Sequence, residues 1–265
     1  MTEKIRLPRI LVTNDDGADA PGLALLAEIA SGLAEEVWVV APERDCSGTS
    51  MMMALRDSIR VAARGERRYI VRGTPGDCVV IALHHLMKDK PPQLLLSGIN
   101  AGSNLGDEAN LSGTLGAALA GLMLGIPSIA ISQECVRDQP VKWETARTHL
   151  PGLLQILLGQ GWRRDTCLSV NIPDAPPEQI REIAWTRQAQ KTIAGMRVDA
   201  RSDLRGDAYF WMALDRKPAE PDSLSDVAAL RRKRISVSCM GLDRSIDPGR
   251  RIMPLDPEAD EYAGT

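Results

Sequence analysis

Short apolar segments alternate with segments of helical period through the first half of this chain, and that alternation limits the fold more than any other feature. The apolar segments are nearly continuous, which is typical of strands buried on both faces. Strict alternation predicts βαβ units, and therefore an α/β fold with a parallel sheet between two layers of helices. The predicted strands are Ile10–Thr13, Glu36–Ala41, Gln93–Leu96, Ser128–Ser132 and Cys167–Ile172, and the predicted helices are Pro21–Leu33, Pro75–Met87, Gly113–Leu124 and Trp143–Gly159.

The second part of the chain has a different pattern. After Cys167–Ile172 comes the proline-rich segment Pro173–Pro177, and beyond it lie short β-type runs separated by polar stretches. These runs are Ile183–Thr186, Tyr209–Leu214 and Ile235–Cys239. We therefore predict a core over residues 1–172, and over residues 173–265 an extension with hairpins that packs on the core.

Charge and cysteine content narrow the classes of partner and compartment. The formal net charge is −3, whereas a nucleic-acid-binding protein usually has a basic excess, so no nucleic-acid partner is predicted. The five cysteines form no CxxC motif and are odd in number, which argues against a disulfide framework and favours a reducing cytoplasm. No apolar segment reaches 18 residues and the first residues show no apolar leader, so neither a membrane span nor a signal peptide is predicted.

Two adjacent carboxylates follow the first predicted strand, in the segment Asn14-Asp15-Asp16-Gly17. Like charges repel, and burying either carboxylate is costly unless a cation or a hydrogen-bond donor compensates it. Carboxylates are hard oxygen donors, suited to Mg²⁺ or Mn²⁺. The pair therefore predicts a divalent metal site, and the alternative is a turn at Gly17 with Asp15 as its cap.

Further small polar residues follow the other strands of the predicted sheet. Ser47 lies in the loop after the second strand, and Asn100 and Asn104 lie in the glycine-rich loop after Gln93–Leu96. Ser112-Gly113-Thr114 begins a helix, where free N–H groups and the helix dipole form an anion site. Because ligands bind at the carboxyl ends of parallel strands, these loops are expected to converge. The alternatives are helix caps at the serines and left-handed turns at the asparagines.

Other chemistries lack their motifs. The chain has neither a GxSxG elbow nor a GxxxxGK[ST] phosphate loop, and the glycines after Ser97 do not form GxGxxG. The adjacent acids differ from the DxD pattern of aspartyl-phosphate enzymes. His84, His85 and His149 have no metal-ligand spacing, so packed or surface positions are expected for them.

Five motifs in unbroken order resemble the SurE family of stationary-phase survival proteins, which are metal-dependent 5′-nucleotidases. They are NDDGADAPGL (14–23), VVAPERDCSGTS (39–50), GTPGDCV (73–79), SGINAGSNLGDE (97–108) and SGTLGAALAG (112–121). The resemblance implies a Rossmann-like three-layer αβα core and a protruding C-terminal β-hairpin and helical extension used in oligomerisation, as a homodimer or homotetramer.

The resemblance also assigns roles to residues of this sequence. It implies that Asp15, Asp16, Ser47 and Asn100 are the ligands of one divalent metal cation per subunit, with Mg²⁺ or Mn²⁺ expected. Asn104 and the Ser112-Gly113-Thr114 turn match the phosphate-binding positions of the family. We expect Asp15, Asp16 and Asn104 to act in catalysis.

The predicted activity is hydrolysis of nucleoside 5′-monophosphates to nucleoside and phosphate, with 3′-nucleotides as further substrates. One alternative is an exopolyphosphatase acting on short-chain polyphosphate at the same site. A second is a nucleotide-binding regulator without turnover, against which the full set of metal-binding oxygens argues.

Overall fold

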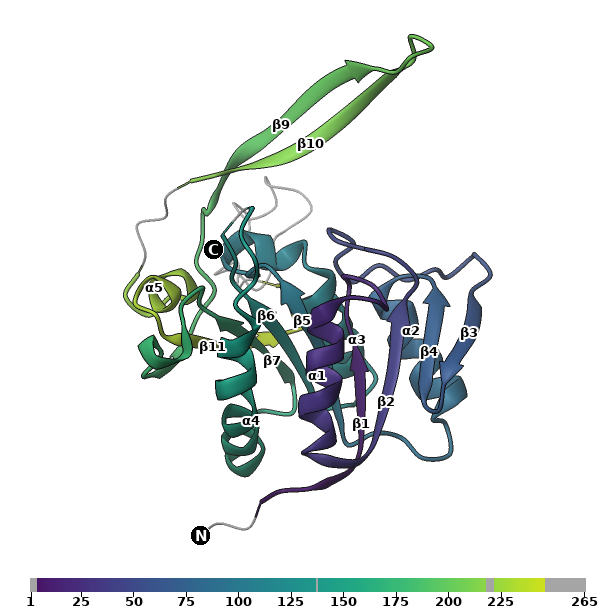
Figure 1. The fold of residues 1–265 in the computed structure, drawn as a ribbon, viewed down its shortest axis with the longest axis vertical. Coiled ribbons are helices and arrows are strands. Elements are labelled where there is room, and N and C mark those ends of the chain that lie inside the picture. The colour runs from purple at the N-terminus through teal and green to yellow at the C-terminus, as the bar shows by residue number, and fades with distance from the viewer. Residues whose placement is uncertain (1–3, 137, 218–221, 246–265) are drawn as a thin grey trace, which may run out of the picture.

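A nine-stranded sheet forms the centre of the molecule, in the order β3-β4-β2-β1-β5-β6-β7-β11-β8 (Figure 1). The structure is a computed structural model that describes residues 4–136, 138–217 and 222–245. The strands are β1 (Leu7–Thr13), β2 (Ala34–Pro42), β3 (Arg60–Gly65), β4 (Arg68–Arg72), β5 (Leu94–Ala101), β6 (Ser128–Gln133), β7 (Thr166–Ile172), β8 (Ile183–Thr186) and β11 (Ile235–Gly241). Neighbouring strands from β4 to β7 are parallel, whereas β3 and β11 pair antiparallel with β4 and β7.

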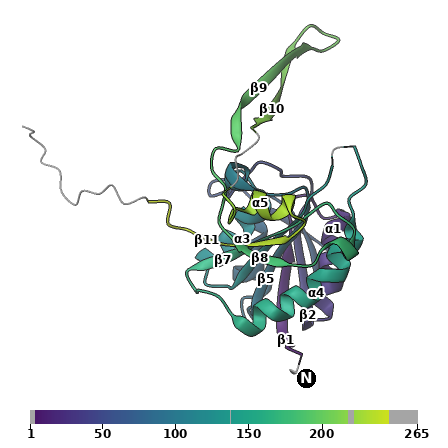
Figure 2. The same cartoon turned by 90° about the vertical axis from the view of Figure 1, so that its left-hand side faces the viewer.

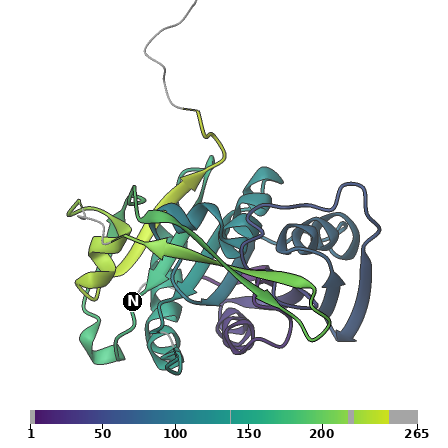
Figure 3. The ribbon, with the colours of Figure 1, turned by 90° about the horizontal axis from the view of Figure 1, so that it is seen from above.

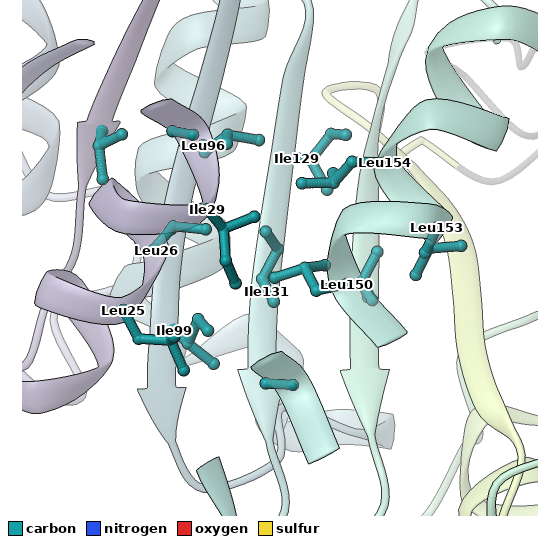
Figure 4. Close-up of a cluster of buried hydrophobic side chains, with 14 of the residues drawn as sticks. Leu25, Leu26, Ile29, Leu96, Ile99, Ile129, Ile131, Leu150, Leu153 and Leu154 are labelled. Carbon is teal, nitrogen blue, oxygen red and sulfur yellow. The ribbon is translucent and has the colours of Figure 1, made fainter. Parts of the chain in front are cut away.

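Helices cover both faces of this sheet, as the alternation predicts. Helices α1 (Pro21–Ser31) and α4 (Trp143–Gln160) pack on one face, and α2 (Pro75–Ile81) and α3 (Gly113–Met123) pack on the other. Figure 4 shows leucine and isoleucine side chains of α1 and α4 against those of β5 and β6. The predicted helix Pro75–Met87 is α-helical only to Ile81 and continues as a π-helical turn, η1 (Ala82–Leu86).

The first strand shows why the apolar segments are continuous. Ile10, Leu11 and Val12 have no exposed surface. Ile10 and Val12 belong to the core beneath α1 and α4, while Leu11 belongs to the core beneath α2 and α3. Each face of the strand is therefore buried, as expected for a central parallel strand.

The chain winds in two directions from β1. It passes first to β2 and β4 on one side of β1, and later to β5, β6 and β7 on the other. The switch of direction lies between β1 and β5, which pair in register from Ile10–Leu94 to Thr13–Ser97. In open α/β sheets, ligands bind at the carboxyl ends of the strands beside such a switch point.

The second part of the chain both extends the sheet and leaves it. Strands β8 and β11 join the sheet beyond β7, and α5 (Asp226–Arg231) packs against them. Strands β9 (Ile193–Ser202) and β10 (Ala208–Arg216) form a separate antiparallel hairpin that projects from the body (Figures 1, 2 and 3). The division at residue 172 stays a prediction, and residues 246–265 of the extension lie outside the described residues.

Candidate metal and phosphate site

The acid pair lies directly after β1, at the switch point of the sheet. Asp15 is buried, with 3% of its surface exposed, and Asp16 is half-buried. Neither carboxylate takes part in an ion pair within the described part of the chain. Burial, and then the charge of Asp16, raise the pKa of Asp15 to about 6. Burial, and then the charge of Asp45, also raise the pKa of Asp16.

The start of α3 lies against Asp15. The buried Thr114 hydroxyl donates a hydrogen bond to Asp15 Oδ1 at 2.5 Å. A Cβ atom at position 113 would lie 2.8 Å from Asp15 Oδ2, so only glycine fits there without a shift. The structure thus brings two residues of the predicted phosphate site, Gly113 and Thr114, into contact with a predicted metal ligand.

The end of β5 lies against Asp16. The backbone N–H of Ala101 donates to Asp16 Oδ2 at 3.1 Å. Its neighbour Asn100 is half-buried, and the Asn100 side-chain amide donates to the Gly102 carbonyl at 2.8 Å. That bond uses the amide nitrogen of Asn100, which leaves its carbonyl oxygen as the group able to meet a cation.

The loop that carries Ser47 is tied to the backbone of Asp15. The N–H of Cys46 donates to the Asp15 carbonyl at 2.8 Å. The N–H and the hydroxyl of Ser47 donate to Asp45 Oδ1 at 2.7 and 2.6 Å, so Asp45 orients this exposed side chain. The sequence prediction omits Asp45, although the Asp-x-Ser spacing is the signal of such a turn.

Asn104 is held from the neighbouring strands rather than by the acid pair. Its N–H donates to Asn171 Oδ1 of β7 at 2.8 Å, and its side-chain amide donates to Ser132 Oγ of β6 at 2.8 Å. Ser132 and Asn171 are therefore supporting residues that the sequence prediction omits. Ser112 caps α3 by accepting the Leu115 N–H at 3.0 Å, which is the alternative that we left open for it.

Any cation at this site would be shared between two carboxylates and neutral oxygens. The described residues contain no group of three or more His, Cys, Asp or Glu side chains that could hold a metal. Asn14 Oδ1, beside the pair, is buried and has no hydrogen-bond partner among the described residues. The site therefore offers several oxygen atoms that can bind a hard cation, and the described residues supply few hydrogen-bond donors to them.

Comparison with known sequences decides the family. The sequence model of the family described as "Survival protein SurE" matches residues 10–195. A protein of Burkholderia lata named 5′-nucleotidase SurE 1 is 44% identical over 239 residues, which cover 90% of this chain and 92% of that protein.

This chain belongs to the SurE family.

A second SurE relative, the 5′-nucleotidase SurE of Azorhizobium caulinodans, is 44% identical over 91% of this chain and 95% of its own length. The crystal structure of the SurE protein from Aquifex aeolicus is 33% identical and covers 90% of this chain and 95% of its own, with a TM-score of 0.77. These matches confirm the resemblance and the α/β fold. No helix in the described ranges has the length and hydropathy required to span a bilayer.

Three surface cavities border this candidate site, two at the predicted residues Ser47 and Ser112 and one at Ala101, the neighbour of Asn100. Ser47 lines one of about 760 Å³, and Ala101 lines one of about 610 Å³ that the base of the hairpin also bounds. Ser112 lines a third of about 570 Å³, next to α3 and β8. All three have the size of small-molecule sites.

Proposed function

We propose that this protein is a metal-dependent phosphomonoesterase that hydrolyses nucleoside 5′-monophosphates to nucleoside and phosphate, with 3′-nucleotides as further substrates. Its curated relatives carry the name 5′-nucleotidase. The observation that carries the proposal is the acid pair beside the start of α3, in which Asp15 is buried and neither carboxylate forms an ion pair among the described residues. A divalent cation would neutralise the two carboxylates and would in turn attract a phosphate group.

The donor set fits a hard divalent cation. Asp15, Asp16, Ser47 and Asn100 offer oxygen ligands, and Asp15 follows β1 while Asn100 lies near the end of the adjacent strand β5. We propose that they hold one Mg²⁺ or Mn²⁺ ion per subunit. When bound, such an ion polarises a phosphoryl oxygen and lowers the pKa of water.

The chain's own residues supply positioning and proton transfer. Asp15 is fixed by Thr114, whereas only Oδ2 of Asp16 accepts a hydrogen bond among the described residues. We assign Asp16 Oδ1 to orienting the attacking water and accepting its proton. The N-terminus of α3, together with Asn104, would stabilise the charge that grows on the phosphoryl oxygens.

A substrate-by-metal screen tests this function. We expect phosphate release from nucleoside monophosphates only with Mg²⁺ or Mn²⁺, and a loss of at least about 10³-fold in kcat for Asp16→Asn. Asp19→Asn, an exposed acid in the same loop, is the matched control and keeps its activity. Full activity of Asp16→Asn, or no release from any nucleotide, would refute the proposal.

The same screen separates the alternatives. Faster phosphate release from short-chain polyphosphate than from AMP would favour the exopolyphosphatase. Tight nucleotide binding in calorimetry with no phosphate release would favour the regulator.

The hairpin supports the proposal of a homodimer or homotetramer. In register, Met196, Val198 and Ala200 lie opposite Leu214, Met212 and Phe210, so one face of the ribbon is apolar over these three pairs. Met212 is 74% exposed and Phe210 is 62% exposed. An isolated two-stranded ribbon is at best marginally stable in water, so a second copy that covers this face would stabilise it. The free cysteines support a cytoplasmic location.

A further inference from the structure

The 3₁₀ helix η2 (Gly106–Asn110) connects two parts of the proposed phosphate site. Asn104 precedes it in the chain, and the Ser112-Gly113-Thr114 turn follows it. It belongs to no strand ladder, so side chains from elsewhere must fix its position. Any movement of η2 would shift Asn104 at one end and the partner of Asp15 at the other.

The base of the β9–β10 hairpin holds η2 through paired contacts. The N–H of Asp107 donates to Thr192 Oγ1 at 2.8 Å, and the N–H of Thr192 donates to Asp107 Oδ2 at 2.7 Å. On the second strand of the hairpin base, Arg216 donates to both carboxylate oxygens of Glu108, at 2.6 and 2.8 Å. The N–H of Lys217 donates to the Thr192 carbonyl at 2.8 Å, which joins the two ends.

Gly106 is the tightest point of this contact. Its φ is +52°, and a Cβ atom there would lie 2.4 Å from the methyl carbon of Thr192. Its N–H donates to the buried Asp226 Oδ2 at 2.9 Å, and its carbonyl accepts the Gln188 side-chain amide at 2.7 Å. Thr192 is itself 7% exposed, so its hydroxyl and its methyl both face packed neighbours.

We infer that Thr192 and Arg216, at the base of the hairpin, are positioning residues for the phosphate side of the site, acting through Asp107 and Glu108 of η2. The sheet holds the segment at Asn104, through Ser132 and Asn171. Asp226 and Gln188 contact it at Gly106, and Ser50 donates to the carbonyls of Asn110 and Leu111. The hairpin base adds the contacts to the side chains and backbone of Asp107 and Glu108, so the phosphate-binding groups depend on a segment far from them in the sequence. The inference rests on the proposed function.

The sharpest test compares two substitutions of Thr192. Thr192→Val keeps the shape but removes the hydroxyl that accepts the Asp107 N–H, whereas Thr192→Ser keeps the hydroxyl. With AMP and saturating Mn²⁺ we expect kcat to fall about tenfold in Thr192→Val, with KM within about twofold and activity retained in Thr192→Ser. Equal losses in both variants, or none in Thr192→Val, would overturn the inference.

The hairpin also offers a matched control for its ion pair. Arg216→Met removes the contact with Glu108, whereas Arg197→Met removes an ion pair with Asp199 and Asp215 farther out on the same strands. Because exposed ion pairs contribute little, we expect only an about threefold fall in kcat for Arg216→Met and no change for Arg197→Met. Equal kcat in these two variants would show that Arg216 is not a positioning residue for the phosphate side of the site.

Hydrogen exchange of residues 104–114 provides a readout that needs no substrate. We expect faster amide exchange there in Thr192→Val, at an unchanged melting temperature, and wild-type exchange in Thr192→Ser. Unchanged exchange in Thr192→Val would overturn the positioning role even if kcat fell. If the wild-type protein released no phosphate but the exchange differed as expected, the proposed function would fail and the support of η2 by the hairpin base would stand.

Discussion

The acid pair and the projecting hairpin are both exceptions to the rule that charged side chains are exposed and apolar side chains are buried. The acid pair includes a buried charge, and the hairpin exposes apolar side chains. Asp15 is a charged group with 3% of its surface exposed, whereas Met212 is an apolar side chain that is 74% exposed. Asp15 lies at the switch point of the sheet, and Met212 lies on a hairpin that projects from the body (Figure 2).

The two regions need different partners: one to neutralise the buried charge and one to cover the exposed apolar surface. A small cation can reach a carboxylate through a narrow opening and restore its electrostatic balance. An apolar strip of several side chains needs a surface of similar size, such as a second copy of the chain. The buried group thus indicates a ligand, and the exposed group indicates a protein partner.

The largest expected effect in this comparison is on the stability of the metal-free protein. The pKa of Asp15 is raised from 3.8 to about 6, so between these pH values the folded protein holds a proton that the unfolded chain has released. The contribution of Asp15 to the free energy of unfolding therefore falls as the pH rises through this window and is lowest above it. Asp15→Asn should raise the free energy of unfolding at pH 7 by up to about 3 kcal/mol, measured by urea denaturation.

Two controls belong to that measurement. The gain from Asp15→Asn should vanish near pH 4, and Asp19→Asn should show no gain at either pH. Adding Mn²⁺ should stabilise the wild type and not the Asp15→Asn variant. A destabilised Asp15→Asn protein at pH 7 would show that the buried carboxylate is already compensated.

The apolar face of the hairpin should have the next largest effect. Phe210→Ser with Met212→Ser removes two exposed apolar side chains from it, and we expect self-association to weaken by at least about 100-fold, or 2.7 kcal/mol. Tyr209→Ser with Trp211→Ser alters the opposite face of the same strand and is the matched control. Sedimentation across a concentration series measures both, and equal dissociation of the two double variants would contradict the assignment of the face.

The smallest effect concerns the hydrogen bond from Thr114 to Asp15. Thr114→Val removes the donor and should weaken Mn²⁺ binding about tenfold in calorimetry, because the carboxylate loses the group that fixes its orientation. Thr114→Ser keeps the hydroxyl and should bind as the wild type does. Unchanged affinity in Thr114→Val would mean that Asp15 is oriented by the protein backbone instead.

The sequence predicts the central sheet well because burial on both faces leaves a strong signal there. Our prediction contains no strand at Arg60–Gly65, whose residues are all exposed and rich in arginine. It also contains none at Ile193–Ser202, although Met196, Val198 and Ala200 alternate with charged residues there. That period of two was readable, but it indicates an exposed amphipathic strand rather than a buried one.

Part of the candidate site is also readable from the sequence, because loops after parallel strands share one edge of the sheet. The family relationship is confirmed, and the relatives carry the name of the predicted activity. The metal ligands, the identity of the metal and the oligomer stay predictions. Asn171 and Thr192 hold the site by accepting hydrogen bonds from the N–H groups of Asn104 and Asp107. These hydrogen bonds join residues that are distant in sequence, so no local sequence pattern predicts them.

The register of the hairpin limits how this arm can change in length. Successive side chains of a strand point to opposite faces, so one residue inserted within β10 between Met212 and Leu214 would turn Phe210 and Met212 to the face that carries Arg197 and Asp199. Two inserted residues would restore the pattern and lengthen the arm. Among relatives of this protein, hairpins with an intact apolar face should therefore differ in strand length by even numbers of residues.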